Sequence, residues 1–394
     1  MRGQPVVSQA ANLGKSEQSR PTKASYQERP YQTAIVKRTI EFLYEGRDGK
    51  GDPIESVLIE APTGAGKTVV ALMAAREAAE RGARRIAWVA MRRNLLTNAA
   101  RENVDKGFGL DIQFISMFQN EGLPAEGEVD LLIVDEAHHD ACETMASLHK
   151  RLRPARLIGL SATPYRTDRA GLCFKKQVKE AGIYQLVREG WLASYEHYTI
   201  KSWTPESVAR VYMETPEKWG KSIVFFRTVE QCEEAASILR GGGHIVEVVT
   251  GGSDKEAQLE AFENGDVRVL LNCMVLTEGF DCPSLETAFV RPSAKGPTTQ
   301  MAGRALRKAD GIQKKIVQCQ ATKAPFTKIA PAAAHLILNE DTRRWQPLNP
   351  DARIEEKLKE MRRVIANAPV DVESLSAITN SPKVKKSRRN FRRG

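Results

Sequence analysis

A glycine-rich segment at residues 61–68, Ala-Pro-Thr-Gly-Ala-Gly-Lys-Thr, carries the clearest chemical signal in this chain. It fits the phosphate-binding pattern G-x-x-x-x-G-K-[ST], except that Ala61 replaces the first glycine. In this pattern, backbone N–H groups and the N-terminus of a following helix bind phosphate oxygens. Lys67 then neutralises the β- and γ-phosphates, and the Thr68 hydroxyl coordinates Mg²⁺. The segment therefore predicts a site for a nucleoside triphosphate with Mg²⁺.

Two adjacent acids, Asp135 and Glu136, follow the apolar run at residues 131–134. Parallel sheets present their ligands at such strand ends. We expect Asp135 to hold Mg²⁺ through water, and Glu136 to orient and deprotonate the attacking water. A metal site is the alternative, because residues 138 and 142 would share a helical face. Its ligands would be His138, His139 and Cys142.

Short apolar runs alternate with helical stretches around these motifs. Strands are predicted at residues 57–59, 86–89, 112–115, 131–134, 157–160, 223–226, 245–249 and 267–271. Helices are predicted from the glycine-rich loop to about residue 81, and at 94–104, 230–239 and 254–263. Asp254 is the expected N-cap of the last helix. Buried strands that alternate with helices indicate an α/β fold with parallel sheets.

The pattern restarts near Trp203, which predicts a second α/β domain. The expected parts are a basic arm at 1–25, domains at 26–202 and 203–345, a helical extension at 346–382 and a basic tail at 383–394. Residues 330–338 fit a helix. A second helix is predicted from the spacing of four apolar residues, and it is expected to pack on the second domain rather than bind a partner. These residues are Ile354, Leu358, Met361 and Ile365.

Length and composition indicate a two-domain globular protein outside the membrane. The chain has 394 residues, 41% hydrophobic and 27% charged, without an apolar run long enough to cross a bilayer. Its six scattered cysteines, none in a C-x-x-C pair, favour a reducing compartment, and we expect a cytoplasmic location. A mitochondrial presequence is the alternative for the basic N-terminus. The net charge of +10 equals the +3 of residues 1–25 plus the +7 of residues 383–394. Such tails suit phosphate backbones or are simply solvated ends.

Seven motifs in one order over residues 28–307 resemble those of superfamily-two helicases of the DEAH-containing type, in the DNA repair, recombination and restriction branch. Besides the glycine-rich loop and Asp-Glu-Ala-His at 135–138, five other segments match. They are Arg-Pro-Tyr-Gln at 29–32, Met-Arg-Arg-Asn-Leu at 91–95, Ser-Ala-Thr-Pro-Tyr-Arg-Thr-Asp at 161–168, Thr-Glu-Gly-Phe-Asp at 277–281, and Gln-Met-Ala-Gly-Arg-Ala-Leu-Arg at 300–307.

The resemblance implies a role for each matching residue. Gln32 would bind adenine, and Arg304 and Arg307 would act as arginine fingers on the γ-phosphate, with Gln300 beside them in the same motif. The remaining nucleotide contacts would come from Thr63, Gly64, Ala65, Gly66, Gly279 and Asp281. Coupling of hydrolysis to movement would involve His138, Ser161 and Thr163. Nucleic-acid contacts would come from Arg92, Arg227, Thr250 and Thr277.

The same resemblance implies two tandem RecA-like domains with an active-site cleft between them. ATP hydrolysis would then need both domains, and their opening and closing would move nucleic acid. DNA is favoured as the partner, because the motifs at 161–168 and 277–281 resemble the DNA-directed branch. An RNA helicase and an ATP-driven clamp that does not unwind are the alternatives. A monomer is expected. Because no recognition module follows the motifs, sequence-specific loading is expected to need a partner protein.

Overall fold

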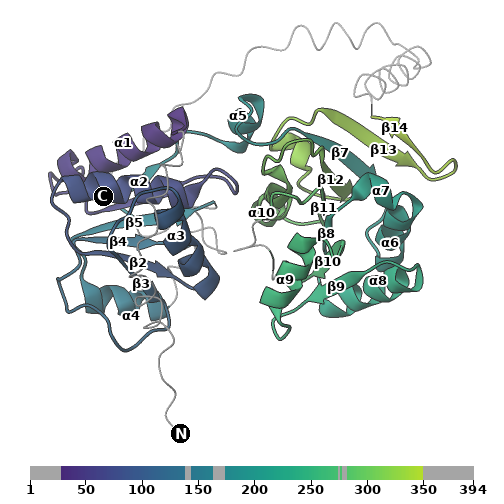
Figure 1. Cartoon of the computed structure of the whole chain (residues 1–394). Helices are drawn as coiled ribbons and strands as arrows, with labels where there is room; N and C mark the ends of the chain where they lie inside the picture. The colour runs from purple at the N-terminus through teal and green to yellow at the C-terminus, as the bar shows by residue number, and fades with distance from the viewer. Residues whose placement is uncertain (1–27, 138–142, 163–173, 274–275, 277–281, 349–394) are drawn as a thin grey trace, which may run out of the picture. The chain divides into compact units, whose positions relative to one another are not determined.

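The computed structural model of the chain describes residues 28–137, 143–162, 174–273, 276 and 282–348. These residues form two mostly parallel sheets with helices on both faces (Figure 1). The predicted α/β fold class is confirmed. The basic arm, the helical extension and the basic tail lie outside the described residues. Within the described residues, no helix combines the length and apolar character needed to cross a bilayer.

The first sheet has six parallel strands in the order β3-β2-β4-β5-β1-β6. The strands are β1 (Ser56–Glu60), β2 (Ile86–Ala90), β3 (Ile112–Ser116), β4 (Leu131–Val134), β5 (Arg156–Ser161) and β6 (Lys176–Val178). The five apolar runs predicted as strands in this half are all strands, within one or two residues at each end. The strand β6 was not predicted.

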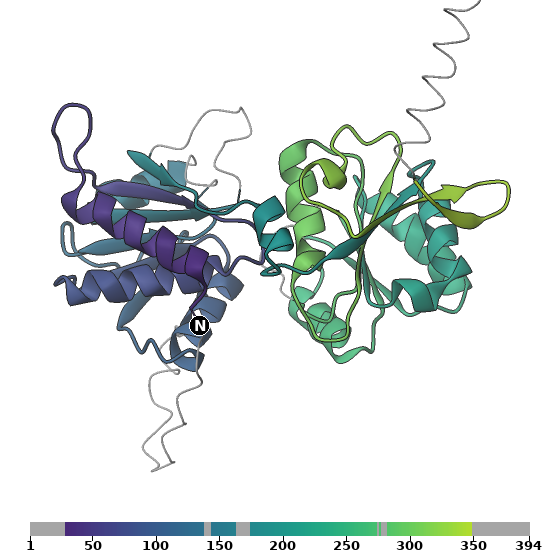
Figure 2. The same cartoon turned by 90° about the horizontal axis from the view of Figure 1, so that it is seen from above.

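Helices cover both faces of the first sheet. Side chains at alternate positions of its strands join α1 (Pro30–Glu45) and α2 (Lys67–Glu80) in one apolar cluster. The other positions join α4 (Glu143–Leu152) in a separate cluster. α3 (Arg93–Asp105) packs beside α2. The helix α1 runs along the face of the sheet that α2 also covers (Figure 2). The strands are buried on both faces, which explains their uninterrupted apolar sequences.

The second sheet has eight strands in the order β14-β13-β7-β12-β11-β8-β10-β9. They are β7 (Tyr195–Ile200), β8 (Ser222–Phe225), β9 (Val246–Val249), β10 (Val269–Asn272), β11 (Thr287–Phe289), β12 (Lys314–Cys319), β13 (Ala334–Asn339) and β14 (Arg344–Pro347). The short helix α5 (Ile183–Arg188) precedes β7. Because β7 pairs with β12 and β13, this sheet already includes residues that precede the expected domain start at 203.

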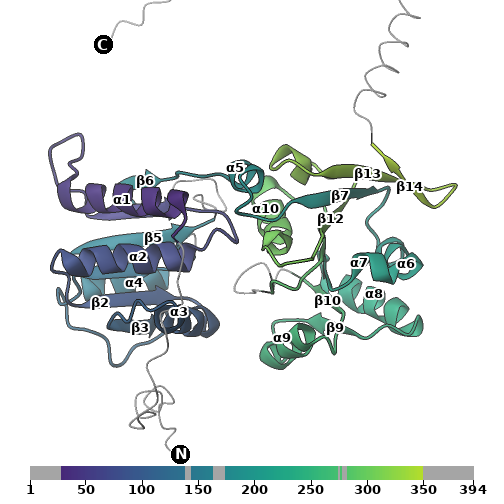
Figure 3. The same cartoon turned by 45° about the horizontal axis from the view of Figure 1, so that its top comes forward.

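Helices also flank the second sheet on two sides (Figure 3). One apolar cluster contains α6 (Pro205–Glu214), α7 (Pro216–Trp219) and α8 (Val229–Gly241). On the other face lie α9 (Lys255–Asn264), α10 (Lys295–Gly303) and the 3₁₀ turns η4 (Arg304–Leu306) and η5 (Phe326–Lys328). The predicted N-cap of α9 is confirmed, because the Asp254 side chain accepts a hydrogen bond from the Ala257 N–H at 3.2 Å.

The helix predicted at residues 330–338 is wrong. Residues Ala334–Asn339 form β13, which pairs in parallel with β7 and places Leu336 opposite Tyr198. The run of alanines at 332–334 favours a helix by local propensity. Pairing with the exposed edge of β7 satisfies the backbone and overrides that preference.

Candidate active site

A cavity of about 340 Å³ gathers most of the residues that the sequence assigned to nucleotide binding and hydrolysis. Its wall includes Gln32, Thr63, Gly64, Gly66, Lys67, Thr68, Asp135, Glu136, Arg304 and Arg307. The residues of the first sheet reach the cavity because β1 and β4 both end at the same edge of a parallel sheet. The two arginines reach it from η4 and the residue that follows it.

The glycine-rich loop explains why Gly64 and Gly66 are glycines and why Ala61 need not be. Gly64 and Gly66 have φ angles of 83° and 77°, a region that side chains disfavour. A Cβ atom on Gly66 would also lie 2.8 Å from Gln32 Nε2. Ala61, in contrast, continues the strand, since its N–H donates to the Ser161 carbonyl at 3.1 Å. The sequence therefore departs from the strict motif at Ala61, a position that does not require the conformational freedom of glycine.

The start of α2 at Lys67 presents a helix N-terminus to the cavity. Gly66 is its N-cap and supplies no side-chain hydrogen bond, and the first turn contains no acidic residue. The backbone N–H groups of a first helical turn have no partners within the helix and carry partial positive charge. This end of the helix is consequently suited to a phosphate group.

Asp135 and Glu136 follow β4 and are 8% and 9% exposed. The Glu136 N–H donates to Asp135 Oδ1 at 2.9 Å, and Glu136 Oε1 lies 3.7 Å from Lys67 Nζ. Burial raises the pKa of Asp135, and the neighbouring Glu136 charge adds to this rise, while Lys67 opposes it. Glu136 has a φ of 50°, which is rare outside glycine and is often found at functional sites. The loop lysine and the acid pair thus form one charged cluster.

The other end of the cavity rests on α1. Gln32 is 2% exposed, and its Nε2 donates to the Ala65 carbonyl at 3.1 Å. The Tyr31 hydroxyl donates to the same carbonyl at 2.8 Å. The Arg29 guanidinium lies 5.7 Å from the centre of the Trp191 ring, within cation–π range. Tyr31 and Gln32 thus support the phosphate loop, and Arg29, Gln32 and Trp191 line the cavity.

Arg304 and Arg307 approach the loop from the second half of the chain. A Cβ atom on Gly303 would lie 3.1 Å from Thr63 Cβ, and one on Gly64 would lie 3.6 Å from Arg307 Cγ. Burial lowers the pKa of Arg307 to about 10, so the guanidinium remains charged at neutral pH. Gln300 is partly buried on α10 but does not line the cavity.

Four described residues that were expected to contact nucleic acid or to couple hydrolysis to movement do not line this cavity: Arg92, Ser161, Arg227 and Thr250. Arg92 follows β2, and Ser161 ends β5, so both lie at the cavity edge of the first sheet. Arg227 and Thr250 follow β8 and β9, at the corresponding edge of the second sheet. The other predicted positions lie outside the described residues. They are His138, Thr163, Thr277, Gly279 and Asp281, together with the alternative ligands His139 and Cys142.

Sequence reasoning missed two notable residues of the cavity wall. Glu102 projects from α3, and Trp191 follows α5. Neither belongs to a recognised motif. The sequence did contain a signal for Glu102, because Leu95, Asn98 and Glu102 fall on one face of the predicted helix. All three residues line the cavity. For Trp191 the sequence offered no such signal.

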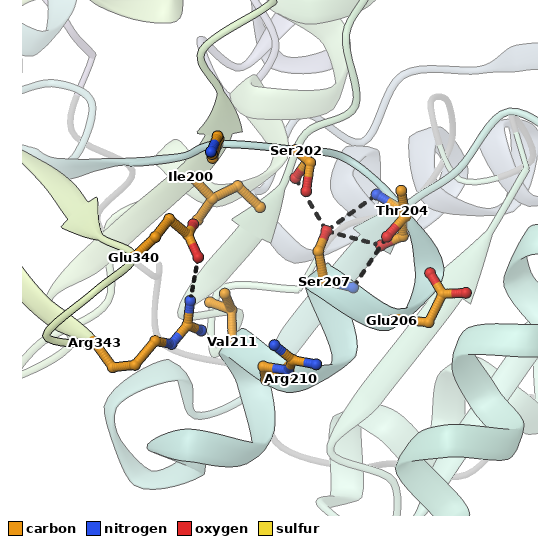
Figure 4. Close-up of a pocket in the computed structure, with 10 residues that line it drawn as sticks. Ile200, Ser202, Thr204, Glu206, Ser207, Arg210, Val211, Glu340 and Arg343 are labelled. Carbon is orange, nitrogen blue, oxygen red and sulfur yellow. Dashed lines mark hydrogen bonds and ion pairs between the residues drawn. The ribbon is translucent and has the colours of Figure 1, made fainter.

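A second cavity, of about 220 Å³, lies between α6 and the β13–β14 connection and contains none of the predicted site residues. Figure 4 shows two sets of its polar groups paired with one another, Ser202 and Thr204 with Ser207, and Glu340 with Arg343. Ser207 Oγ donates to the Ser202 carbonyl at 3.1 Å, and Arg343 Nη1 donates to Glu340 Oε2 at 2.6 Å. The first bond fixes the start of α6 and the second lies within the β13–β14 turn, so both have a structural role.

Two protein families match the chain. One, described as a helicase conserved C-terminal domain, matches residues 204–309. The other, described as the res subunit of type III restriction enzymes, matches residues 25–111 and 111–166. The first match begins near the predicted domain start, and the second contains the phosphate loop and the acid pair.

Similar proteins include two yeast proteins described as ATP-dependent helicases. IRC3 of Saccharomyces cerevisiae is 26% identical over 220 residues, 45% of this chain and 32% of the relative. The mitochondrial irc3 of Schizosaccharomyces pombe is 25% identical over 251 residues, 53% of this chain and 41% of the relative. The chain therefore spans only about a third to two fifths of the length of these relatives.

Two solved structures show a similar fold. The type ISP restriction-modification enzyme LlaBIII, bound to DNA, has a TM-score of 0.55 at 14% identity, over 77% of this chain and 28% of that one. Dbp5 of S. cerevisiae, bound to RNA and ADP BeF₃, has a TM-score of 0.52 at 13% identity, over 84% and 97%. The tandem RecA-like architecture of such helicases accounts for the two sheets. Together, the motifs, the fold and these matches support a superfamily-two helicase, in the branch of restriction and repair enzymes.

Proposed function

We propose that this protein is an ATP-dependent helicase or translocase that acts on DNA. One observation carries the proposal: a single cavity is lined by the loop lysine Lys67, the acid pair Asp135 and Glu136, and the arginines Arg304 and Arg307. Phosphoryl transfer depends on positioning and on charge stabilisation around the phosphates. These residues are of the types that supply both.

The residues around Lys67 fit a nucleotide with Mg²⁺. Thr68 and Asp135 both line the cavity, and hydroxyl and carboxylate oxygens are ligands that Mg²⁺ accepts. The described residues contain no cluster of three or more metal-binding side chains. That fits a cation held by one or two side chains together with substrate phosphates. When bound, Mg²⁺ would neutralise charge that develops on the phosphate oxygens.

Glu136 is the proposed base, and the arginines are the proposed stabilisers of the transition state. Glu136 Oε1 lies 3.7 Å from Lys67 Nζ, so the carboxylate would lie next to a γ-phosphate that Lys67 binds. There it would orient a water molecule and accept its proton. Arg304 and Arg307 would balance the charge that develops on the transferred group. Because the arginines follow β11 and the lysine follows β1, we propose that hydrolysis is coupled to relative movement of the two sheets.

Nucleic acid is proposed to lie along the strand ends that carry Arg92, Arg227 and Thr250. Arg227 is exposed, and its backbone is anchored, because its N–H donates to Gln231 Oε1 at 3.1 Å. The tail at 383–394 adds seven basic residues and no acidic one. If this tail binds phosphates, its deletion should make the slope of log binding constant against log salt concentration less steep. The slope should change by about 0.7–0.9 for each phosphate that is no longer neutralised. An unchanged salt slope would show that the tail does not contribute.

ATPase activity measured side by side with single-stranded DNA, duplex DNA and RNA tests the proposal. We expect DNA to stimulate turnover. Stimulation by RNA alone would overturn the assignment to DNA and would identify an RNA helicase. No ATP hydrolysis under any condition would overturn the proposed enzyme activity as a whole.

A forked duplex separates unwinding from clamping. Strand separation that requires ATP would support a helicase, and displacement of a bound roadblock without strand separation would support a translocase. Tight binding and ATPase activity with neither outcome would identify a non-unwinding clamp. The same DNA without ATP serves as the control in each case.

A further inference from the structure

Glu102 is a carboxylate in a cavity that is otherwise suited to phosphate groups. It lies on α3, four residues after Asn98, and both line the cavity that contains Lys67 and Arg307. The nearby end of α3 is fixed, because Asn103 Nδ2 donates to the Leu110 carbonyl at 2.8 Å and Asn103 Oδ1 accepts from the Leu110 N–H at 3.1 Å. The position of Glu102 at the cavity wall is therefore well defined.

The Glu102 side chain is partly buried, and the charges of nearby cations offset the effect of burial on its carboxylate. Its Oε2 atom is shielded from solvent and has no hydrogen-bond partner among the residues that the structure describes. Burial raises its pKa, and the nearby charges of Lys106, Arg307 and Arg101 lower it, in that order. A carboxylate shielded from water keeps its charge at a moderate cost only when cations offset the loss of hydration.

Arg307 has a reciprocal relation to Glu102. Burial lowers the pKa of Arg307, and the charge of Glu102 is the main influence that opposes this fall. The stem of Arg307 runs over the phosphate loop, since Cγ would lie 3.6 Å from a Cβ atom on Gly64. Arg307 thus lies beside the phosphate loop and also within electrostatic reach of a carboxylate.

We propose that Glu102 is a positioning residue that holds Arg307 over the phosphate loop before ATP binds and then competes with the γ-phosphate for it. This inference rests on the proposed function. ADP has no γ-phosphate and leaves the interaction of Glu102 with Arg307 in place, whereas ATP must replace it. Glu102 therefore reduces the preference of the protein for ATP over ADP. The exchange of one anion for another also means that Arg307 contributes little net affinity for ATP.

A double-mutant cycle on nucleotide binding tests this inference without requiring turnover. The dissociation constants of fluorescent ADP and of a fluorescent non-hydrolysable ATP analogue are measured for the full chain, Glu102→Gln, Arg307→Ala and the double variant. Glu102→Gln should raise the ADP-to-analogue ratio of dissociation constants by roughly three- to thirtyfold, the range of coupling between neighbouring charges. In the Arg307→Ala background, the same change should alter this ratio by less than about twofold, because the coupled partner is absent.

The controls separate positioning from general repulsion of phosphate. Glu126→Gln removes an exposed acid that is not among the charges acting on Glu102 and should leave the ratio unchanged. Glu102→Asp keeps the charge and should restore a ratio closer to that of the unmodified chain. Glu102→Ala, which also removes the charge, replaces Glu102→Gln in the comparison if that variant does not fold.

Two results would overturn the inference. One is equal tightening of ADP and the ATP analogue by Glu102→Gln. The other is an equal rise of the ratio with and without Arg307. Either result would show that Glu102 acts on phosphates directly and would leave the proposed function standing. If the unmodified chain binds neither nucleotide, both the proposed function and this inference fail.

Discussion

Lys67 and Arg307 are two cations of the same cavity, and each has a carboxylate as its electrostatic partner. Lys67 Nζ lies 3.7 Å from Glu136 Oε1, and both residues extend from strand ends of the first sheet. Arg307 follows a turn of the second half of the chain and interacts over a longer range with Glu102 on α3. The first pair is built within one sheet, and the second brings together distant parts of the sequence.

This difference indicates which step of nucleotide binding or hydrolysis each pair can control. A lysine and an acid fixed by one sheet keep their spacing whatever the rest of the chain does, so they suit constant tasks such as binding phosphates and orienting water. An arginine on another element can contact the phosphates only when that element is in place, so this contact depends on the arrangement of the chain. Four substitutions test this division of tasks, and they are ordered by the size of the expected effect.

Lys67→Ala should have the largest effect. It removes the charge that neutralises the β- and γ-phosphates, so nucleotide affinity should fall and kcat/KM for ATP should drop by at least about a thousandfold. ATPase kinetics and ADP binding measure the two losses separately. Lys37→Ala on the exposed face of α1 is the matched control. Turnover within tenfold of normal would show that the glycine-rich loop is not the phosphate site.

Glu136→Gln should retain ATP binding and lose hydrolysis by about 10²–10⁴-fold, the range for a general base. The amide keeps the shape of the carboxylate but cannot accept a proton from water. A single-turnover assay with prebound ATP isolates this step. Glu126→Gln changes an exposed acid as the control. Normal single-turnover rates would remove Glu136 as the base.

Arg307→Ala should lower kcat by about 10²–10³-fold and leave ATP affinity within a fewfold of normal. The rate falls because charge in the transition state loses a stabilising partner. Affinity is spared because Arg307 exchanges Glu102 for the γ-phosphate. Steady-state kinetics measure the fall of kcat, and the dissociation constant of the ATP analogue measures the affinity. Arg188→Ala on α5 is the control. A large loss of affinity with unchanged kcat would reverse the assigned roles.

Tyr31→Phe should have the smallest effect. It removes the buried hydrogen bond from the Tyr31 hydroxyl to the Ala65 carbonyl, which should lower the free energy of unfolding by about 0.5–1.5 kcal/mol. KM for ATP should rise only a fewfold, because Gln32 still donates to the same carbonyl. Urea unfolding and ATPase kinetics measure the two changes. Tyr184→Phe, on an exposed tyrosine, is the control, and equal destabilisation by both variants would argue against this support of the loop.

The strands that carry motifs could be predicted from sequence because they are buried on both faces. The run of residues 131–134 is entirely apolar, and β4 has the same limits. In contrast, β7 has the sequence Tyr-Glu-His-Tyr-Thr-Ile, and its His197 is buried with Nε2 at 2.9 Å from Gln318 Oε1. A strand whose polar side chains pair with one another inside the fold does not stand out as an apolar run. The limits of the two domains stay a prediction.

The site could be predicted to the extent that its residues follow fixed spacing. Lys67, Asp135 and Glu136 follow strands, and their motifs place them on one edge of a parallel sheet. Glu102 and Trp191 line the same cavity only because α3 and the segment after α5 approach it in three dimensions. The spacing of residues along the sequence does not show that these two segments lie near the cavity. The roles of all these residues stay predictions, and two of the four substitutions test those of Lys67 and Glu136.

The short segment between the two sheets has a consequence for engineering this protein. The Ala193 N–H donates to the Leu306 carbonyl at 2.8 Å, and a Cβ atom on Gly64 would lie 3.0 Å from Leu192 Cδ2. The chain that joins the sheets is thus also a spacer between the phosphate loop and the arginine turn. A reporter peptide inserted at residues 192–193 would disturb both. The exposed turn at residues 49–51, where added side chains would meet nothing within 4 Å of either glycine, is the better place for such a tag.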